Sequence, residues 1–122
     1  MEKIPISLII PFSRPEFFRS LLKRIQAIQY KGQYEVVVVI NSTKEWVPPG
    51  DLGSRVKLIW SNQKGPSAAR NAGIRAANFS YHVFTDDDCE FKPNLLDLYD
   101  QSWRDNPSAA IIGGRVKVII KG

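Results

Sequence analysis

Two runs of almost unbroken apolar residues constrain the fold of this chain most strongly. They span residues 4–10 and 35–40, and in the second run Glu35 is followed by four valines and an isoleucine. Strands without polar alternation are typical of a parallel sheet that is buried on both faces. The first run stops at Pro11, and the turn-forming residues 41–43 end the second.

The segment after the first run has the pattern of an amphipathic helix. Its apolar residues recur three and four apart, namely Phe17, Phe18, Leu21, Leu22, Ile25 and Ile28. The sequence allows two different N-termini for this helix. Ser13 and Glu16 have the spacing of a capping box, and Pro15 could equally be the first helical residue, with Arg14 as the cap.

The rest of the chain continues the alternation of strands and helices. We expect a strand at 56–60, a helix rich in small residues that opens at Gly65 and Pro66, a strand at 81–85, a helix that starts at Pro93, and an extended segment at 109–120. The order β-α-β-β-α-β-α-β predicts an α/β fold: a Rossmann-like, open, mostly parallel sheet with helices on both faces.

Composition sets limits on the class of protein. The chain has 122 residues, enough for one domain, with 43% hydrophobic and 24% charged residues, as in a soluble globular protein. No apolar run approaches the roughly 20 residues of a membrane span. A single cysteine, Cys89, excludes an intrachain disulfide and fits a reducing compartment. We expect a cytoplasmic location, with attachment to the inner face of the membrane left open.

The net charge of +5 does not by itself identify a partner. The 17 basic residues are spread along the chain, and no zinc spacing, aromatic RNA-binding motif or recognition helix accompanies them. A small anionic cofactor or a nearby anionic lipid surface explains the charge as well as nucleic acid does. We expect no nucleic-acid partner, and a basic nucleic-acid module stays as an alternative that steep salt dependence of oligonucleotide binding would support.

An acidic triplet is the strongest candidate for chemistry. Asp86, Asp87 and Asp88 directly follow the predicted strand at 81–85, and ligands of open α/β sheets bind at the carboxyl ends of strands. Adjacent carboxylates repel one another unless a counter-charge is present, and Mg²⁺ or Mn²⁺ supplies it while also binding phosphates. The alternative is a solvated, aspartate-rich turn. The position at the sheet edge favours the metal.

A second candidate is the start of the small-residue helix, GPSAARNAG. A glycine-led helix N-terminus offers free N–H groups to an anion, and Arg70 adds a planar fork that suits a carboxylate or a phosphate. The segment is neither a Walker A loop nor a GxGxxG fingerprint. An ordinary helix with a surface arginine is the alternative.

The other reactive or aromatic residues are weaker candidates. His82 lies within a predicted strand and is interpreted as structural. Because it is the single histidine, Cys89 has no nearby partner for a nucleophile pair. Three tryptophans, Trp46, Trp60 and Trp103, are expected to be packing residues, although the loop position of Trp46 would also allow it to stack on a ligand.

Four segments in sequence together resemble the inverting glycosyltransferases of family 2. They are SLIIPF with RPEF, then EVVVVINST, GPSAARNAGIRAA and YHVFTDDDCEFKPNLL, and the match runs from about residue 6 to about residue 116. The resemblance implies a GT-A fold, a nucleoside-diphosphate-sugar donor and a divalent metal, Mn²⁺ or Mg²⁺. The donor is a UDP-sugar by default, with GDP- or dTDP-sugars as alternatives, and the implied setting is cell-envelope polysaccharide synthesis.

The resemblance also implies roles for individual residues. Asp86 and Asp88 match the two ends of the family's DxD motif, with Asp88 as the direct metal ligand and Asp86 or Asp87 reaching the ribose. Arg70 matches the family arginine near the diphosphate. The nucleoside is expected to lie against Pro11, Phe12, Ser13 and Asn41.

This chain departs from the family pattern at two places. The family often reads P-x-Y-N-R after its first strand, whereas PFSR here is one residue shorter and lacks the tyrosine. Asn41 stands where the family usually has an aspartate that faces the base. An amide donates as well as accepts, so the resemblance does not fix the base.

The implied reaction is displacement at the anomeric carbon by a hydroxyl of a saccharide or a lipid-linked acceptor, with inversion. In the family, the general base comes from the half of the domain that follows the last strand here. We therefore expect residues 1–122 to be the donor-binding portion, with the acceptor and base portion absent and no catalytic base in this chain. A non-catalytic nucleotide-binding α/β domain is the main alternative. A response-regulator-like domain fits less well, because it requires aspartates after strands that end here at Pro11 and Trp60.

Overall fold

The structure is a computed structural model that describes residues 2–41, 46, 48, 50, 52–62 and 65–108. Its sheet has four strands, and every pair of neighbours is parallel. In chain order they are β1 (Ile6–Phe12), β2 (Tyr34–Ile40), β3 (Val56–Trp60) and β4 (Tyr81–Phe84). Their order in space is β3-β2-β1-β4, so the chain reverses its direction of travel across the sheet between β3 and β4.

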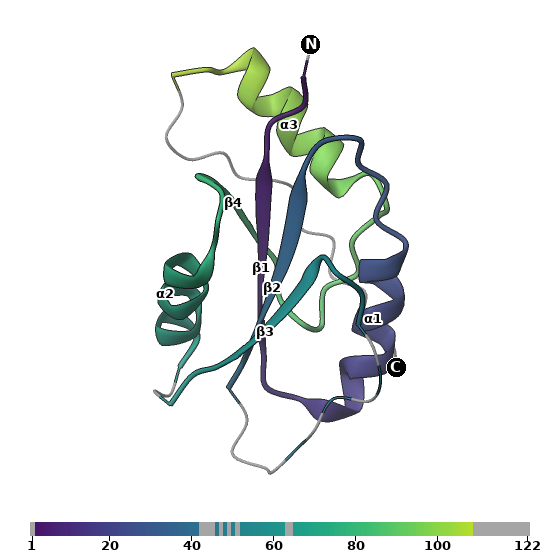
Figure 1. Cartoon of the computed structure of the whole chain (residues 1–122), viewed down its shortest axis with the longest axis vertical. Coiled ribbons are helices and arrows are strands. Elements are labelled where there is room, and N and C mark those ends of the chain that lie inside the picture. The colour runs from purple at the N-terminus through teal and green to yellow at the C-terminus, as the bar shows by residue number, and fades with distance from the viewer. Residues whose placement is uncertain are drawn as a thin grey trace.

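Helices cover both faces of this sheet (Figure 1). A short 3-10 helix at Pro15–Phe17 leads into α1 (Phe18–Gln26), followed later by α2 (Pro66–Ala76) and α3 (Leu95–Asp105). α2 packs on one face, while α1 and the buried Leu96 of α3 share a cluster on the other. The predicted fold class, an open parallel α/β sheet with helices on both faces, is confirmed.

The unbroken apolar pattern of β1 follows from this layering. Leu8 and Ile10 belong to the core cluster beneath α1, whereas Ile9 belongs to the cluster beneath α2. Because successive side chains of a strand point to opposite faces, both alternating sets are fully buried. β2 has the same arrangement, with Val36 and Val38 on the α1 side and Val37 and Val39 on the other.

The small residues of α2 let the helix lie very close to the sheet. A Cβ atom added at Gly73 would stand 2.4 Å from Cγ2 of Ile9 and 3.2 Å from Cγ2 of Val39. Ala69, one turn earlier, is 1% exposed and packs in the same cluster. The inner face of the helix therefore has space for glycine alone at position 73 and for a side chain as small as alanine at position 69.

The ends of the elements differ slightly from the sequence prediction. β1 continues through Pro11 to Phe12, whose carbonyl oxygen accepts a hydrogen bond from the amide of Asn41. The first helical residue is Pro15, after Arg14 as cap, and no side-chain cap bond forms, so the capping box of Ser13 and Glu16 is absent. The expected extended segment at 109–120 and the turn residues 42 and 43 lie outside the described residues.

Within the described part of the chain, no helix has the length and hydropathy that a bilayer crossing requires.

Candidate functional site

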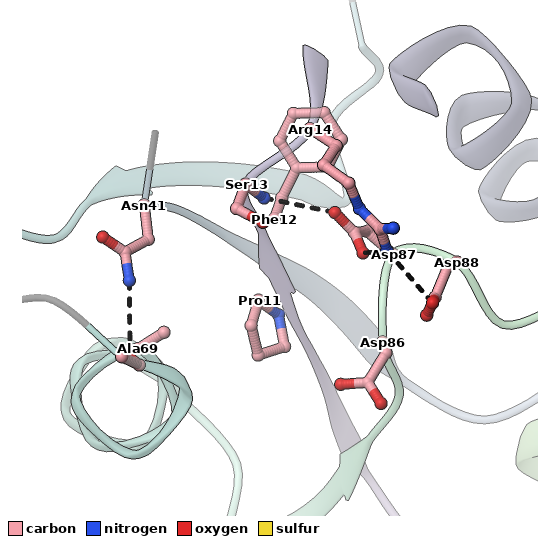
Figure 2. Close-up of a pocket in the computed structure, with 10 residues that line it drawn as sticks. Pro11, Phe12, Ser13, Arg14, Asn41, Ala69, Asp86, Asp87 and Asp88 are labelled. Atoms are coloured by element: carbon pink, nitrogen blue, oxygen red, sulfur yellow. Dashed lines mark hydrogen bonds and ion pairs between the residues drawn. The ribbon is translucent and has the colours of Figure 1, made fainter. Parts of the chain in front are cut away.

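A pocket of about 490 Å³ opens at the carboxyl ends of β1, β2 and β4 (Figure 2). Its volume falls within the range of small-ligand sites. It is lined by Pro11, Phe12, Ser13, Arg14, Asn41, Gly65, Ala69, Asp86, Asp87 and Asp88. The pocket therefore lies where the strand order reverses, which is the usual ligand position in open α/β sheets.

Pro11 helps to place the acidic turn at this edge. The amide of Thr85 donates to the carbonyl oxygen of Ile9, which is the last hydrogen bond between β4 and β1. In a regular parallel ladder, the next donor would be the amide of residue 11, and proline has none. The pairing stops there, and the chain leaves the sheet at Asp86.

The three aspartates of the turn have different surroundings. Asp87 is 5% exposed, and its carboxylate accepts hydrogen bonds from the Ser13 amide at 3.1 Å and from Nη2 of Arg14 at 2.9 Å. Asp88 is exposed and forms an ion pair with the same Nη2 at 3.0 Å. Asp86 is exposed at the pocket wall. Asp87 therefore ties the turn to the end of β1, and Asp86 and Asp88 face the pocket.

Arg14 is held by both carboxylates and by an aromatic ring. Its hydrogen bonds with Asp87 and Asp88 raise the pKa of the guanidinium, so it stays charged at every relevant pH. The guanidinium carbon also lies 4.7 Å from the centre of the Phe17 ring, within the range of a cation–π contact. This arginine supplies a fixed positive charge beside the acidic turn.

A second arginine, Arg24 of α1, holds the main chain of the turn. Its Nη2 donates to the carbonyl oxygen of Asp87 at 3.0 Å, and its Nη1 donates to that of Cys89. The guanidinium lies over the ring of Phe91 at 5.7 Å. Within the turn, the amide of Cys89 donates to the carbonyl oxygen of Asp86 at 3.3 Å. Arg24 thus fixes the backbone from which the pocket carboxylates project.

The donor atoms of the turn fit a divalent cation. One ligand atom each from Asp86, Asp88 and Cys89 lie within 4.8 Å of one another. Two carboxylates suit Mg²⁺ or Mn²⁺, which bind through one or two protein carboxylates and complete their shell with phosphate and water oxygens. A thiol is a poor ligand for such hard cations, so Asp86 and Asp88 are the fitting pair.

The opposite side of the pocket is formed by Asn41 and the start of α2 (Figure 2). The side-chain amide of Asn41 donates to the carbonyl oxygen of Gly65 at 3.3 Å, which links the end of β2 to the helix. Gly65 precedes the helix with φ of 104°, a backbone conformation that favours glycine. The first amides of α2 therefore start beside the pocket.

Most of the residues predicted for the site lie together. Pro11, Phe12, Ser13, Asn41 and the three aspartates all line the pocket. The Phe12 ring packs at 5.5 Å from that of Phe18 and 5.3 Å from that of Trp46, so it belongs mainly to the core. Trp46 and Trp103 pack against the core, as predicted, whereas Trp60 at the end of the edge strand β3 is 58% exposed, so the prediction that it packs was wrong.

Arg70 is the predicted site residue that does not line the pocket. It lies on α2, one position after the lining residue Ala69, and is half-buried. Within the described chain it makes no hydrogen bond or ion pair.

Three residues at the site are not among those predicted for it, namely Arg14, Arg24 and Cys89. Arg14 carried a usable signal, because it follows the first strand directly and so belongs to the edge that carries the aspartates. Arg24 carried none, since it lies among the polar residues of an amphipathic helix and its contacts are 63 and 65 residues away in sequence.

The family model described as "Glycosyl transferase family 2" matches residues 7–122. No curated protein matches the chain.

Proposed function

This chain belongs to glycosyl transferase family 2 and is a glycosyltransferase domain, and on that premise we propose that its pocket binds the nucleoside diphosphate of a sugar donor together with a divalent cation. One observation carries the proposal. Two exposed carboxylates, Asp86 and Asp88, face a pocket at the reversal of strand order, while the third is engaged by Ser13 and Arg14.

The roles of the three aspartates follow from their surroundings. We assign cation binding to Asp88 and Asp86, and contact with the ribose to Asp86. Asp87 lines the pocket, but both of its oxygens already accept hydrogen bonds from Ser13 or Arg14. Its proposed contribution to donor binding is therefore to hold the other two carboxylates in position.

The nucleoside is assigned to the other end of the pocket. Pro11, Phe12 and Ser13 form its floor, and Asn41 offers an amide to the edge of a base. We propose UDP as the default nucleotide, with GDP and dTDP as alternatives. We propose that the first amides of α2 bind the diphosphate and that Arg70 joins them after a change of its side-chain conformation.

The proposed reaction is transfer of a hexose, with inversion, to an acceptor hydroxyl of a saccharide or a lipid-linked carrier in cell-envelope polysaccharide synthesis. When bound, Mn²⁺ or Mg²⁺ neutralises the charge that develops on the departing diphosphate. The residues of this chain bind and orient the donor, and Arg14 contributes a second fixed positive charge near the same carboxylates. Residues 1–122 are thus proposed as the donor side of the reaction, and none of them is assigned as general base.

Calorimetric titration of UDP and GDP, with and without Mn²⁺, tests this proposal. We expect at least one nucleotide to bind more tightly when Mn²⁺ is present. The Asp88→Ala variant should lose the Mn²⁺-dependent part of the affinity, about tenfold or more, because a charged contact contributes about 1.5–3 kcal/mol. Asp105→Ala, which removes an exposed carboxylate of α3 far from the pocket, is the matched control.

Two results would contradict the proposal. The first is the absence of nucleotide binding under all conditions by the folded wild-type chain. The second is an Asp88→Ala variant whose Mn²⁺ dependence equals that of the wild type, which would place the cation elsewhere.

A further inference from the structure

One nitrogen atom of Arg14 bridges two aspartates that differ in exposure. Nη2 lies 2.9 Å from Oδ1 of Asp87 and 3.0 Å from Oδ2 of Asp88. The side chain of Asp87 is 7% exposed, whereas those of Asp88 and Arg14 are 54% and 41% exposed. The contact with Asp87 is therefore shielded from water, and the contact with Asp88 is open to exchange with solvent and ions.

The contact with Asp88 conflicts with cation binding by the same side chain. A cation at Asp86 and Asp88 and the guanidinium of Arg14 would both draw on the negative charge of Asp88 and would repel each other. A cation at this position therefore favours the release of Arg14 from Asp88. The contact with Asp87 does not have to break, because Asp87 is turned toward Ser13 and is not part of the cation cluster.

Two contacts can hold Arg14 in the pocket after that exchange. The Asp87 ion pair and the Phe17 ring, 4.7 Å from the guanidinium carbon, keep its position. Within the described chain, its hydrogen bonds use Nη2 alone. The other N–H groups of its planar fork remain for a ligand, and such a fork matches the oxygens of a phosphate.

We propose that Arg14 is an exchangeable counter-ion of the cation site: it neutralises Asp88 while no metal is bound, and it turns to the donor's diphosphate when a metal takes Asp88. This inference rests on the proposed function and deepens it, because it gives a specific residue a role in coupling the two ligands. It makes metal binding alone less favourable than metal binding together with the nucleotide.

The proposal predicts effects of opposite sign on the two ligands. Without Arg14, Mn²⁺ alone no longer competes with an internal cation, and the diphosphate loses a donor. We expect Arg14→Gln to bind Mn²⁺ about two- to fivefold more tightly, since an exposed ion pair contributes about 0.2–1 kcal/mol. We expect it to bind UDP, at saturating Mn²⁺, about tenfold more weakly. A merely structural arginine would weaken both.

The test uses the whole chain and two separate readouts. The free Mn²⁺ signal in electron paramagnetic resonance titrations gives the affinity for the metal alone, and calorimetry with UDP at saturating Mn²⁺ gives the affinity for the nucleotide. Arg75→Gln is the control for net charge, because this exposed arginine lies in the last turn of α2, away from the pocket. It should leave both affinities unchanged.

A lysine variant keeps the proposal testable if Arg14→Gln does not fold. Arg14→Lys retains the charge for Asp87 and Asp88 but lacks the planar fork, so Mn²⁺ affinity should stay near that of the wild type while UDP affinity falls. Parallel losses of both affinities in either variant, or unchanged affinities in both, would overturn the role of Arg14. A wild-type chain that binds neither Mn²⁺ nor UDP would instead overturn the proposed function itself.

Discussion

At the scale of single residues, the acidic turn depends on partners that are remote in sequence. The aspartates themselves contain no sign of which one is buried. Asp87 takes that place because Ser13 and Arg14, which lie 74 and 73 residues earlier, reach it across the sheet edge. The sequence predicted the edge and the triplet. It did not predict which of the three aspartates is buried, because this depends on hydrogen bonds between the residues that follow β1 and those that follow β4.

Arg24 offers the sharpest residue-scale prediction. Arg24→Met should keep the aliphatic packing of α1 but remove both hydrogen bonds to the carbonyl oxygens of Asp87 and Cys89. The turn should then open more often, so the amides of residues 86–91 should exchange hydrogen at least about tenfold faster, given about 1.5 kcal/mol or more for a bond from a charged donor. The affinity for Mn²⁺ should fall as well, because the carboxylates of the turn are then held less firmly.

The matched control for that change is Lys23→Met, an exposed neighbour on the same helix. It should leave exchange in the turn unchanged. If Arg24→Met and Lys23→Met gave the same exchange profile, Arg24 would not be what holds the turn.

At the scale of elements, the type of each helix and strand was predictable and several of their ends were not. The two buried strands and the amphipathic α1 followed from apolar spacing alone. The end of β1 was misjudged because proline usually breaks a strand. Here, β1 stays paired with β2 through Phe12, and Pro11 ends only the pairing with β4, because its missing amide faces that side.

The packing of α2 gives an element-scale prediction. Gly73→Ala should lower the free energy of unfolding by about 1–3 kcal/mol, because its Cβ would stand 2.4 Å from a methyl group of the buried Ile9. The clash should cost more than the roughly 1 kcal/mol that alanine gains over glycine in helix propensity, so the variant should be less stable than the wild type. Urea unfolding followed by circular dichroism measures the difference.

An alanine at an exposed position of the same helix is the control. Asn71→Ala should leave stability unchanged or raise it by a few tenths of a kcal/mol, through propensity alone. A Gly73→Ala protein as stable as this control would mean that α2 lies farther from the sheet than described.

At the scale of the whole molecule, two buried carboxylates tie distant parts of the chain together. Asp100 of α3 accepts a hydrogen bond from the Ile4 amide at 2.9 Å and pairs with Arg104. Glu35 of β2 accepts hydrogen bonds from Ser7 and from Asn78. Polar side chains of this kind leave little trace in a single sequence, since their partners lie up to 96 residues away.

These carboxylates predict how stability depends on pH. Burial alone would raise both pKa values, but hydrogen bonds, from the Ile4 amide and Arg104 to Asp100 and from Ser7 and Asn78 to Glu35, outweigh it and lower them. A lowered pKa contributes stability above the unfolded value of about 4, and this contribution is lost as the pH falls through the folded pKa. Urea unfolding at a series of pH values below about 5 should therefore show a steep loss.

Replacing one of these buried carboxylates should make the stability of the protein depend less on pH. Asp100→Asn should be less stable than the wild type at pH 7, and the gap should narrow as the pH falls toward about 2. Asp105→Asn, an exposed neighbour on α3, should follow the wild-type curve. A gap that is constant over the whole pH range would show that the charge of Asp100 does not contribute.

The cation site can be located in a crystal of the chain grown with UDP and Mn²⁺, through anomalous scattering at the manganese edge. If Asp86 and Asp88 hold the cation, one strong anomalous peak should lie within coordination distance, about 2.0–2.3 Å, of carboxylate oxygens of both residues, with the diphosphate on its other side. A peak elsewhere, or a bound nucleotide with no metal between these two side chains, would contradict this assignment.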